Sequence, residues 1–421
     1  MLVSISASNF LSFKDKIEFS FVCNDTSNKN TYFSIKKKYQ KKEKDYAVNK
    51  VSAIYWANAS WKTNVLKVVS FMKEMILLSH DQNFKLSPIF KPYLLIKDLK
   101  QDSDFWVDFF IDDVLYSYSF TINLLSSEII KESLLEYKSQ KATTLFKRNG
   151  QNFLMNEHFQ EWKERKQFVR ANSLALSVFS NMSWDISSKI RKYFKEKVHV
   201  FQWNMIPNNW DMIDTINMID LHKEEFNPFL QKLLTAADIN INRMDCTIKE
   251  ISTSNIQGAP NKDYPDKKIR LFSNTFNHFI YDDQGNKVWD IDFNPINEST
   301  WTNILVSLSW SLYNVLKEWM ALFIDEIDSS LHPILVKEIV SKFNSASNSN
   351  QWQLFFTTHD ISLLDGDKKL PKDQIWFVDK NKKWESSLYS LDEFNWVNSI
   401  NSISKAYLLW KFDAIPHVWE F

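Results

Sequence analysis

The segment that most constrains the fold lies at residues 54–64 and reads I-Y-W-A-N-A-S-W-K-T-N. An apolar run precedes it at residues 51–55, and apolar residues with helical spacing follow it at 65–76. This order of strand, tight loop and helix is that of a phosphate-binding P-loop, G-x-x-x-x-G-K-[ST], whose backbone N–H groups and helix N-terminus surround phosphates. Lys62 and Thr63 occupy the last two positions of the motif, so they are candidates for neutralising phosphate charge and for binding Mg²⁺.

Both glycine positions of this motif hold tryptophan, at Trp56 and Trp61. Glycine is needed there because the loop adopts positive φ angles and its backbone approaches the phosphates closely. The composition offers an explanation, since glycine provides 4 of the 421 residues and tryptophan provides 17, whereas ordinary glycine usage is about 7%. Counting the tryptophans as glycines would raise glycine usage to about 5%, which is ordinary for a globular protein.

Other tryptophans also occupy positions that suit glycine. Trp319 lies between a helical run and an apolar strand, where a C-cap glycine is expected, and Trp384 lies in a polar turn between two strand-like runs. Trp376, inside an apolar run, is the best candidate for a genuine tryptophan, and Trp106 is ambiguous. We hypothesise that the gene uses UGA for glycine, as some bacteria do, and that this codon has been read as tryptophan. TGA codons are therefore expected at Trp56, Trp61, Trp301, Trp319 and Trp410.

Charge and composition indicate a folded protein without a global attraction to nucleic acid or membrane. The chain has 44% hydrophobic residues and a formal net charge of +0, and two cysteines are too few for a disulfide framework or a cysteine-based metal site. It opens on a strand pattern without a signal peptide, and no apolar run reaches the ~18 residues of a membrane span. A cytoplasmic location is therefore expected. The run at residues 35–44 is a local basic patch; a charge run of this kind predicts a solvated loop, and a binding patch is the alternative.

Alternating apolar residues predict two strands near the start of the chain and an antiparallel lobe after the P-loop helix. The first pair is joined through the sequence N-F-L-S-F at residues 9–13. The lobe contains a hairpin turn at Asn149-Gly150. The predicted strands lie at residues 3–7, 17–21, 105–111, 114–122, 128–137 and 144–153.

The middle of the chain shows a different pattern. Residues 157–237 are predicted to be mostly helical, and no heptad repeat persists long enough there for a coiled-coil arm. Strands are expected again at residues 246–251 and 269–281, and a turn follows at residues 283–286.

Polar residues follow two buried strands in the last third of the chain. Residues 321–328 read A-L-F-I-D-E-I-D, and a second apolar strand ends in T-T-H at residues 357–359. In P-loop enzymes such an acidic strand end places its first acid, Asp325, to hold Mg²⁺ through water, and its next acid, Glu326, to orient or deprotonate the attacking water.

These segments together resemble the heads of ABC-type ATPases, and most closely the bacterial ATP-binding proteins with an AAA-type core domain found in abortive-infection and antiphage loci. The similarity covers nearly the whole chain, although Leu11 stands where the family usually has a basic residue. The segments that carry it are N-F-x-S-F at residues 9–13, the loop at 55–63, V-R-A-N at 169–172, E-S-x-[G]-T at 298–302, F-I-D-E-I-D-S-S-L-H-P at 323–333, T-T-H at 357–359 and the ending at 406–416.

The resemblance implies an α/β P-loop NTPase fold of the ABC-ATPase-head type with an antiparallel β lobe and a helical insertion. It implies the N-terminal half of the head at residues 1–95, the β lobe at 96–156, the helical insertion at 157–237, returning β segments at 238–290, the C-terminal half of the head at 291–396 and a tail at 397–421.

The resemblance also implies ATP as substrate and Mg²⁺ as cofactor. Lys62, Glu326 and His359 would be catalytic, with His359 sensing the γ-phosphate, and Thr63 and Asp325 would hold the metal. Ser299 would contact the γ-phosphate held by a second subunit, so that two chains close head-to-tail over two ATP molecules. The nucleotide-binding residues would be Trp56, Ala57, Asn58, Ala59, Ser60, Trp61, Lys62, Thr63, Asn64, Ser299, Thr300 and Trp301.

The implied role is that of the sensor or motor subunit of a defence system, working with a separate nuclease or toxin-like effector and without a membrane. Binding of DNA or RNA stays open, and so does a simpler interpretation of each residue: Ser299 as an N-cap, Glu298 as a solvated acid, and His359 as an ordinary surface histidine. If the tryptophans are genuine, the chain would be an inactive P-loop scaffold. A DNA-repair ATPase of the SMC class is a further alternative, but it requires long coiled coils between its two halves.

Overall fold

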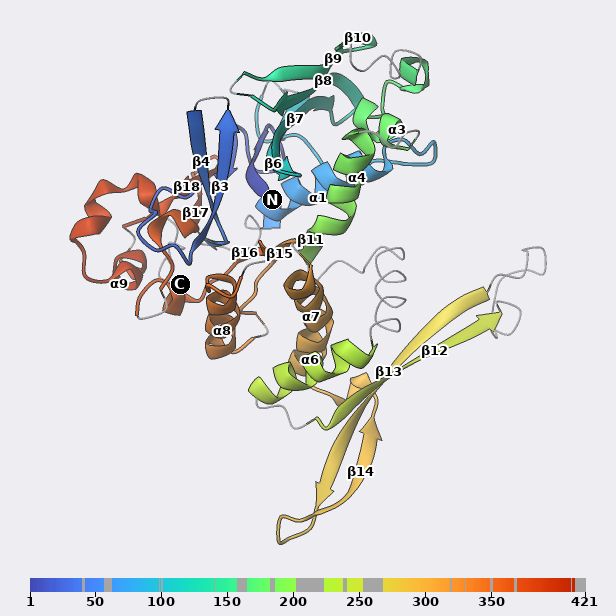
Figure 1. Cartoon of the computed structure of the whole chain (residues 1–421), viewed down its shortest axis with the longest axis vertical. Helices are drawn as coiled ribbons and strands as arrows, with labels where there is room; N and C mark the ends of the chain where they lie inside the picture. Colours follow the sequence, from blue (N-terminus) through green and yellow to red (C-terminus); the bar gives the residue numbers. More distant parts are fainter. Residues whose placement is uncertain are drawn as a thin grey trace. The chain divides into compact units, whose positions relative to one another are not determined.

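The computed structural model (Figure 1) divides the chain into two compact units, which are described separately. The first consists of Met1–Gln202, Val315–Ser329 and Val336–Phe421, and the second of Trp203–Asn314 and Ser330–Leu335. The structure describes every residue except 40–41, 57–62, 98, 100, 140, 157–164, 182–185, 202–222, 238–240, 253–267, 319, 330, 349–350, 367–368, 410 and 413–421.

A six-stranded sheet forms the centre of the first unit. Its first five strands run parallel and its edge strand β18 is antiparallel. The residues of β5, β15 and β16 are all buried, which explains why these strands are continuous apolar runs without alternation. The strand order is β11 (Val198–Phe201), β15 (Ala321–Ile324), β16 (Gln353–Thr357), β5 (Val51–Trp56), β17 (Ile375–Lys380) and β18 (Ser386–Ser390).

A seven-stranded antiparallel sheet forms a second layer of the first unit and confirms the predicted strand pair and lobe. Gly150 has a φ of +58° between β9 and β10, as the predicted hairpin turn requires. The strand order is β10 (Asn152–Met155), β9 (Thr143–Asn149), β8 (Glu128–Tyr137), β7 (Val114–Asn123), β6 (Asp102–Ile111), β1 (Leu2–Ser8) and β2 (Ile17–Ser20).

The core of the first unit lies between these two sheets and around α1 (Thr63–Leu78). Phe71 of α1 packs against Phe105 of β6, with ring centroids 4.6 Å apart. At the β2 edge of the seven-stranded sheet, the ring centroid of Phe19 lies 5.2 Å from that of Trp376 in β17. Trp376 is buried in an apolar contact, as expected of a genuine tryptophan.

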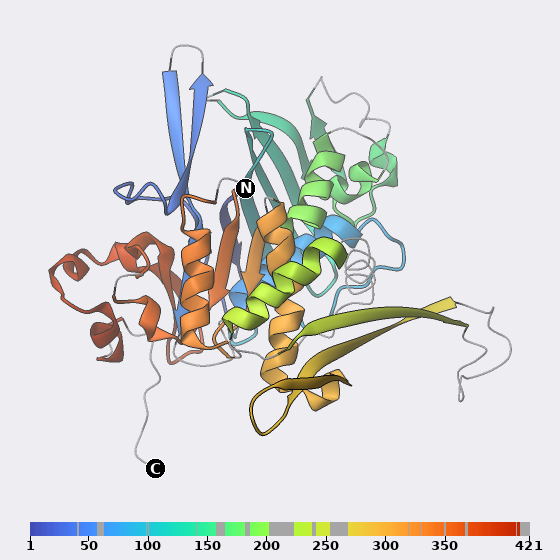
Figure 2. The same ribbon diagram turned by 60° about the horizontal axis from the view of Figure 1, so that its bottom comes forward.

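The remaining elements of the first unit surround these layers. The basic run predicted as a loop is instead paired, since β3 (Tyr32–Tyr39) and β4 (Lys42–Asn49) form an antiparallel hairpin that projects from the unit (Figure 2). Between Ile35 and Lys44 only Tyr39 is apolar, so little alternation marks the strands there, and the prediction of a loop was wrong. The short elements are η2 (Lys166–Phe168), α3 (Ala175–Ser180), α4 (Ile186–Lys197), η5 (Ile361–Leu363), η6 (Lys372–Gln374), η7 (Leu391–Glu393), η8 (Asn395–Ser399) and α9 (Ile403–Leu408).

The second unit contains a long three-stranded antiparallel sheet and the helices at its base (Figure 1). Phe226 of α6 packs edge-on against Trp310 of α7 at 5.1 Å. The helices α7 and α8 continue into the first unit. These elements are α6 (Lys223–Ala236), β12 (Arg243–Ser252), β13 (Lys268–Tyr281), β14 (Lys287–Phe293), η4 (Pro295–Asn297), α7 (Thr300–Lys317) and α8 (Pro333–Phe343).

Three features differ from the predicted organisation. The segment 157–237, predicted to be mostly helical, contains the strand β11, which completes the edge of the central sheet. Strand β14 was not predicted, although Trp289, Ile291 and Phe293 alternate with two aspartates; all but its last residue are exposed. Residues 291–314 belong to the compact unit that contains the three-stranded sheet, whereas the predicted organisation assigns them to the C-terminal half of the head.

Among the described residues, no helix combines the length and apolarity needed to cross a membrane.

Candidate functional site

The predicted site residues of the first unit meet at the carboxyl edge of the parallel sheet. Strand β16, which leads to T-T-H, pairs with β5 on one side and with the acidic strand β15 on the other. Because parallel strands end at the same edge, Trp56, Asp325 and Thr357 are brought together there, which is where open α/β sheets bind ligands. Residues 57–62, which include Ala57, Asn58, Ala59, Ser60, Trp61 and Lys62, lie outside the described part of the chain.

A chain of hydrogen bonds joins the first residue of α1 to the ends of β15 and β16. The hydroxyl of Thr63 donates to Asp325 Oδ2 at 2.7 Å, and the hydroxyl of Thr357 donates to Asp325 Oδ1, also at 2.7 Å. The backbone N–H of Glu326 in turn donates to Thr357 Oγ1 at 2.6 Å. Both oxygens of the Asp325 carboxylate are therefore oriented by hydroxyl groups.

These oxygen donors are of the kind that Mg²⁺ prefers, since the ion binds carboxylates, hydroxyls and water. Thr63 Oγ1 and Asp325 Oδ2 already lie in contact, half-buried, at the edge of the sheet. The residues present thus fit a divalent cation. In the described part of the chain, no three His, Cys, Asp or Glu side chains are placed to hold a metal ion together, so phosphate and water would have to complete the ligand shell.

Glu326 adopts an unusual backbone conformation. Its φ is +50°, in the left-handed region that side chains other than Gly, Asn and Asp rarely enter. Its N–H bond to Thr357 holds this conformation in place. Strained residues of this kind persist only where surrounding contacts hold them in place, and they are found most often at active sites.

His359 follows β16 and has an exposed side chain. Its backbone N–H donates to Asp328 Oδ2 at 2.9 Å, which connects the T-T-H segment to the acidic segment a second time. Its ring lies 4.2 Å from that of Trp56, which is 1% exposed at the end of β5. The indole at the first glycine position of the loop thus packs against the histidine expected to sense phosphate.

The predicted signature residues belong to the second unit. Ser299 immediately precedes α7, Thr300 is the first helical residue, and Trp301 is half-buried. The backbone N–H of Thr302 donates to Ser299 Oγ at 3.0 Å, so Ser299 is an N-cap, as the simpler interpretation predicted. Glu298 is not the solvated acid of that interpretation, because its side chain lies 2.6 Å from His278 Nε2 and is 9% exposed.

Several residues near the site had no role assigned from the sequence. Thr357 and Asp328 belong to recognised motifs, and the available signal was that Thr357 ends the buried strand β16 and Asp328 follows the buried strand β15. Tyr407 of α9 donates to the carbonyl of Trp56 at 3.3 Å, and nothing in its local sequence indicates this. Asn64, predicted to bind nucleotide, is buried with Nδ2 donating to Ser12 Oγ at 2.9 Å, so its side chain connects α1 to the loop at residues 9–13.

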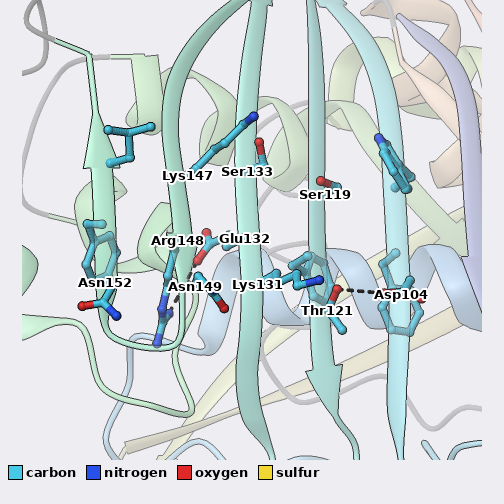
Figure 3. A pocket seen from close by; sticks show the side chains of 15 residues that line it. Asp104, Ser119, Thr121, Lys131, Glu132, Ser133, Lys147, Arg148, Asn149 and Asn152 are labelled. Atoms are coloured by element: carbon cyan, nitrogen blue, oxygen red, sulfur yellow. Dashed lines mark hydrogen bonds and ion pairs between the residues drawn. The ribbon is translucent and has the colours of Figure 1, made fainter. Parts of the chain in front are cut away.

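A separate cavity of about 610 Å³ lies on the open face of the seven-stranded sheet (Figure 3). Among its lining residues, Asp104 accepts a hydrogen bond from Thr121 on the neighbouring strand, and Lys131 and Lys147 line it as well. None of the predicted site residues lines it. The predicted site and this cavity are therefore distinct.

Comparisons with known proteins connect the second half of the site to a described family. Residues 303–365 match the family model "AAA domain, putative AbiEii toxin, Type IV TA system". The matched stretch contains β15, both acids at its end and the T-T-H segment, but neither the loop at residues 57–62 nor Ser299. No curated protein matches the chain.

Three solved structures with similar folds are heads of Smc proteins. One is an Smc head bound to the C-winged helix domain of ScpA, with a TM-score of 0.41, 12% identity and coverage of 97% of this chain and 99% of that chain. Another is an SMC head domain from Thermotoga maritima, with a TM-score of 0.37, 13% identity and coverage of 92% of this chain and 98% of that chain. The third is an Smc head domain with an extended coiled coil bound to the C-terminal domain of ScpA, derived from Pyrococcus furiosus, with a TM-score of 0.41, 10% identity and coverage of 97% of this chain and 98% of that chain. The arrangement of this chain's own strands, with the T-T-H strand between the P-loop strand and the acidic strand, is consistent with a P-loop NTPase.

Proposed function

We propose that the chain binds ATP with Mg²⁺ and hydrolyses it. The observation that carries this proposal is the hydrogen-bonded chain from Thr63 through Asp325 and Thr357 to Glu326. It joins the helix after the loop, the acidic strand end and the T-T-H strand, which are more than 260 residues apart at the extremes. These bonds hold both oxygens of one carboxylate, one through Thr63 at the start of α1 and the other through Thr357 at the end of β16.

Activity is proposed for the chain with glycine at positions 56, 61 and 301. The indole of Trp56 supports this condition, because it packs on His359 at the place where the loop backbone must approach phosphate. Trp384 gives independent support for misread glycine codons, since its φ of +66° is an outlier for a bulky side chain. With tryptophan at these positions the chain would be an inactive scaffold.

The residues would divide the chemistry as follows. Lys62 neutralises charge on the β and γ phosphates, and Thr63 and Asp325 hold Mg²⁺, which supplies electrostatic stabilisation of the transferred phosphoryl group when it is bound. Glu326 accepts a proton from the attacking water. His359 contacts the γ-phosphate, and its position relative to the acids is set by the bond from its backbone N–H to Asp328.

The finer part of the proposal concerns assembly and biological role. We propose a head-to-tail homodimer in which Ser299 of one chain completes the site of the other, and a role as the sensor or motor subunit of an abortive-infection or antiphage system. The family resemblance and the match to a model described by an AbiEii toxin system support this role. An effector with nuclease or toxin-like chemistry would be a separate protein.

The test of the enzymatic proposal uses the full chain with Trp56→Gly, Trp61→Gly and Trp301→Gly. This variant should hydrolyse ATP in the presence of Mg²⁺, and the chain with the three tryptophans should not bind ATP. Adding Glu326→Gln should preserve ATP binding but slow turnover by about 10²–10⁴-fold, because the general base is lost while the phosphate-binding groups stay. Hydrolysis by the Glu326→Gln variant at the parent rate would show that Glu326 is not the base.

A further inference from the structure

Glu298, the residue before the proposed nucleotide-contacting serine, pairs with a histidine far from it in sequence. Its Oε1 lies 2.6 Å from Nε2 of His278, and the two side chains are 9% and 24% exposed. The ring of His278 also packs against Phe293 with centroids 4.9 Å apart. The imidazole is thus held on two sides, and its N–H donates to a carboxylate that has little access to water, which makes this a strong hydrogen bond.

His278 lies in β13, the middle strand of the three-stranded sheet, next to a residue whose side chain hydrogen-bonds to the neighbouring strand. The neighbouring Asn277 is 2% exposed, and its Nδ2 donates to Asp290 and to Asp292 of β14, each at 2.7 Å. Its Oδ1 accepts from the side chain of Asn242, just before β12, at 2.8 Å. The side-chain contacts of Asn277 therefore connect β13 to β14 and to the residue that precedes β12, next to His278.

The chain between this sheet and the signature is short. Strand β14 ends at Phe293, the single turn η4 follows, and Ser299 begins the cap of α7. Ser299 Oγ contacts Thr302 Oγ1 at 2.8 Å in addition to accepting the Thr302 N–H. A movement of the sheet would therefore reach Ser299 through two connections: the backbone of residues 294–298 and the His278–Glu298 pair.

We propose that His278 is a positioning residue for Ser299, and that through Glu298 it couples the three-stranded sheet to the nucleotide. This inference rests on the proposed function of Ser299. With the pair intact, the sheet holds the signature segment in one orientation, so the serine hydroxyl and the first N–H groups of α7 are ready to meet a γ-phosphate. By linkage, a nucleotide bound by Ser299 stabilises the matching orientation of the sheet, and whatever moves the sheet changes the affinity of the dimer for ATP.

The first experiment measures positioning in the chain as it is, without nucleotide. Hydrogen exchange of the backbone amides at residues 299–303 should rise in His278→Ala by about tenfold, because one charge-assisted hydrogen bond is lost. His278→Gln, which keeps an N–H donor, should restore most of the protection. Ile291→Ala is the matched control, since Ile291 pairs directly with His278 across the sheet, is 43% exposed and lies outside the proposed machinery. It should leave these amides unchanged.

The second experiment measures coupling in the glycine-restored chain carrying Glu326→Gln. His278→Ala should weaken ATP-driven dimerisation by about tenfold in analytical ultracentrifugation, while the affinity of the dilute monomer for ATP stays the same, because the P-loop is untouched. A general structural defect would instead lower both. A double-mutant cycle with Glu298→Ala should show that the two losses are not additive.

The outcomes separate this inference from the proposed function. Unchanged amide protection in His278→Ala, or equal loss in Ile291→Ala, would overturn the positioning role whether or not the chain is an ATPase. Raised exchange with normal dimerisation would overturn the coupling. If the glycine-restored parent neither dimerises with ATP nor hydrolyses it, the proposed function is wrong and the coupling falls with it, while the exchange experiment still decides the local role of His278.

Discussion

At the scale of single residues, backbone conformation distinguishes one tryptophan from another. Trp384 stands at the left-handed position of the turn between β17 and β18, with its N–H donating to Asn381 O at 2.9 Å. Its indole is 51% exposed and contacts Lys380 Nζ at 3.6 Å. Trp376 of the same hairpin is 6% exposed and packs against Phe19. The first environment suits glycine and the second suits tryptophan.

These two positions give a stability test of the misread codons. Trp384→Gly should raise the free energy of unfolding by about 0.5–1.5 kcal/mol, because left-handed strain of roughly 1–2 kcal/mol is removed and only an exposed cation–π contact is lost. Trp376→Gly should lower it by about 3–5 kcal/mol, because a buried ring leaves a cavity. Chemical denaturation of both variants checks this, and destabilisation by Trp384→Gly would argue that its tryptophan is genuine.

Lys50 presents a different residue-scale feature, a buried ammonium group at the start of the P-loop strand. It is 4% exposed, its Nζ donates to Ser345 O at 3.1 Å, and burial lowers its pKa from 10.5 to about 8. Below pH 8 the lysine is charged in both the folded and the unfolded chain, so the folded state bears the full cost of burial. Between about pH 8 and 10.5 the folded state releases the proton first, and the cost fades.

Lys50→Met should therefore raise the free energy of unfolding at pH 7 by about 1–3 kcal/mol, and the difference from the parent should shrink as the pH approaches 10.5. Denaturant titrations at pH 7 and pH 10 measure this difference in the free energy of unfolding. The tyrosines titrate in both proteins, so their contribution to the pH dependence cancels in the difference. Lys131→Met, at an exposed position, is the control and should show a flat difference. A variant less stable than its parent at pH 7 would mean that the bond to Ser345 outweighs the cost of burial.

At the scale of elements, a buried ion pair holds the segment at residues 169–180 against the seven-stranded sheet. Arg148 of β9 and Glu132 of β8 are both fully buried, 3.6 Å apart. Glu132 accepts from the backbone N–H groups of Ala175 and Leu176, and Arg148 donates to the carbonyls of Arg170 and Ser173. The V-R-A-N segment noted in the sequence is therefore held by side chains from the β lobe.

Removing one member of this pair should release the segment. Arg148→Met is expected to lower the free energy of unfolding by about 3–5 kcal/mol, since it leaves the Glu132 charge buried without its cation. Hydrogen exchange should rise at the amides of Ala175 and Leu176 before it rises in α1. Lys147→Met, at the adjacent exposed position of the same strand, should change stability by less than about 0.5 kcal/mol. Equal effects of the two substitutions would contradict the role of the pair.

At the scale of the whole molecule, the proposed dimer makes a prediction about mixed chains. In the glycine-restored protein, Lys62→Ala and Ser299→Arg should each abolish ATPase activity, because each damages both composite sites of its homodimer. Mixing the two should restore part of the activity, since one site of the heterodimer carries both changes and the other carries neither. Light scattering of the ATP-bound Glu326→Gln protein is the control, because strict cooperativity between sites could also suppress recovery. Monomers across a concentration range would exclude the head-to-tail dimer.

Elements whose signals are local are predictable from the amino-acid sequence. The apolar runs of β5, β15 and β16 follow from burial on both faces, the hairpin at Gly150 follows from its turn residues, and Ser299 is recognisable as a cap. The order of motifs along the chain also indicated which polar residues would end neighbouring strands, and Thr63 and Asp325 are indeed in contact.

Contacts that no local pattern encodes appear only in the folded chain. Strand β11 follows the helix α4 directly, and its four residues are recognisable as part of the central sheet only from their parallel pairing with β15. The hydroxyl of Thr357 bridges Asp325 and Glu326 because β15 and β16 are neighbouring parallel strands. His278 of β13 meets Glu298, 20 residues later in the chain, through the return of the chain along β14 and η4. The packing of Trp56 against His359 likewise depends on β5 and β16 lying side by side. The tryptophan at the first glycine position of the motif therefore differs from the P-loop pattern in sequence and also contacts another residue of the proposed site.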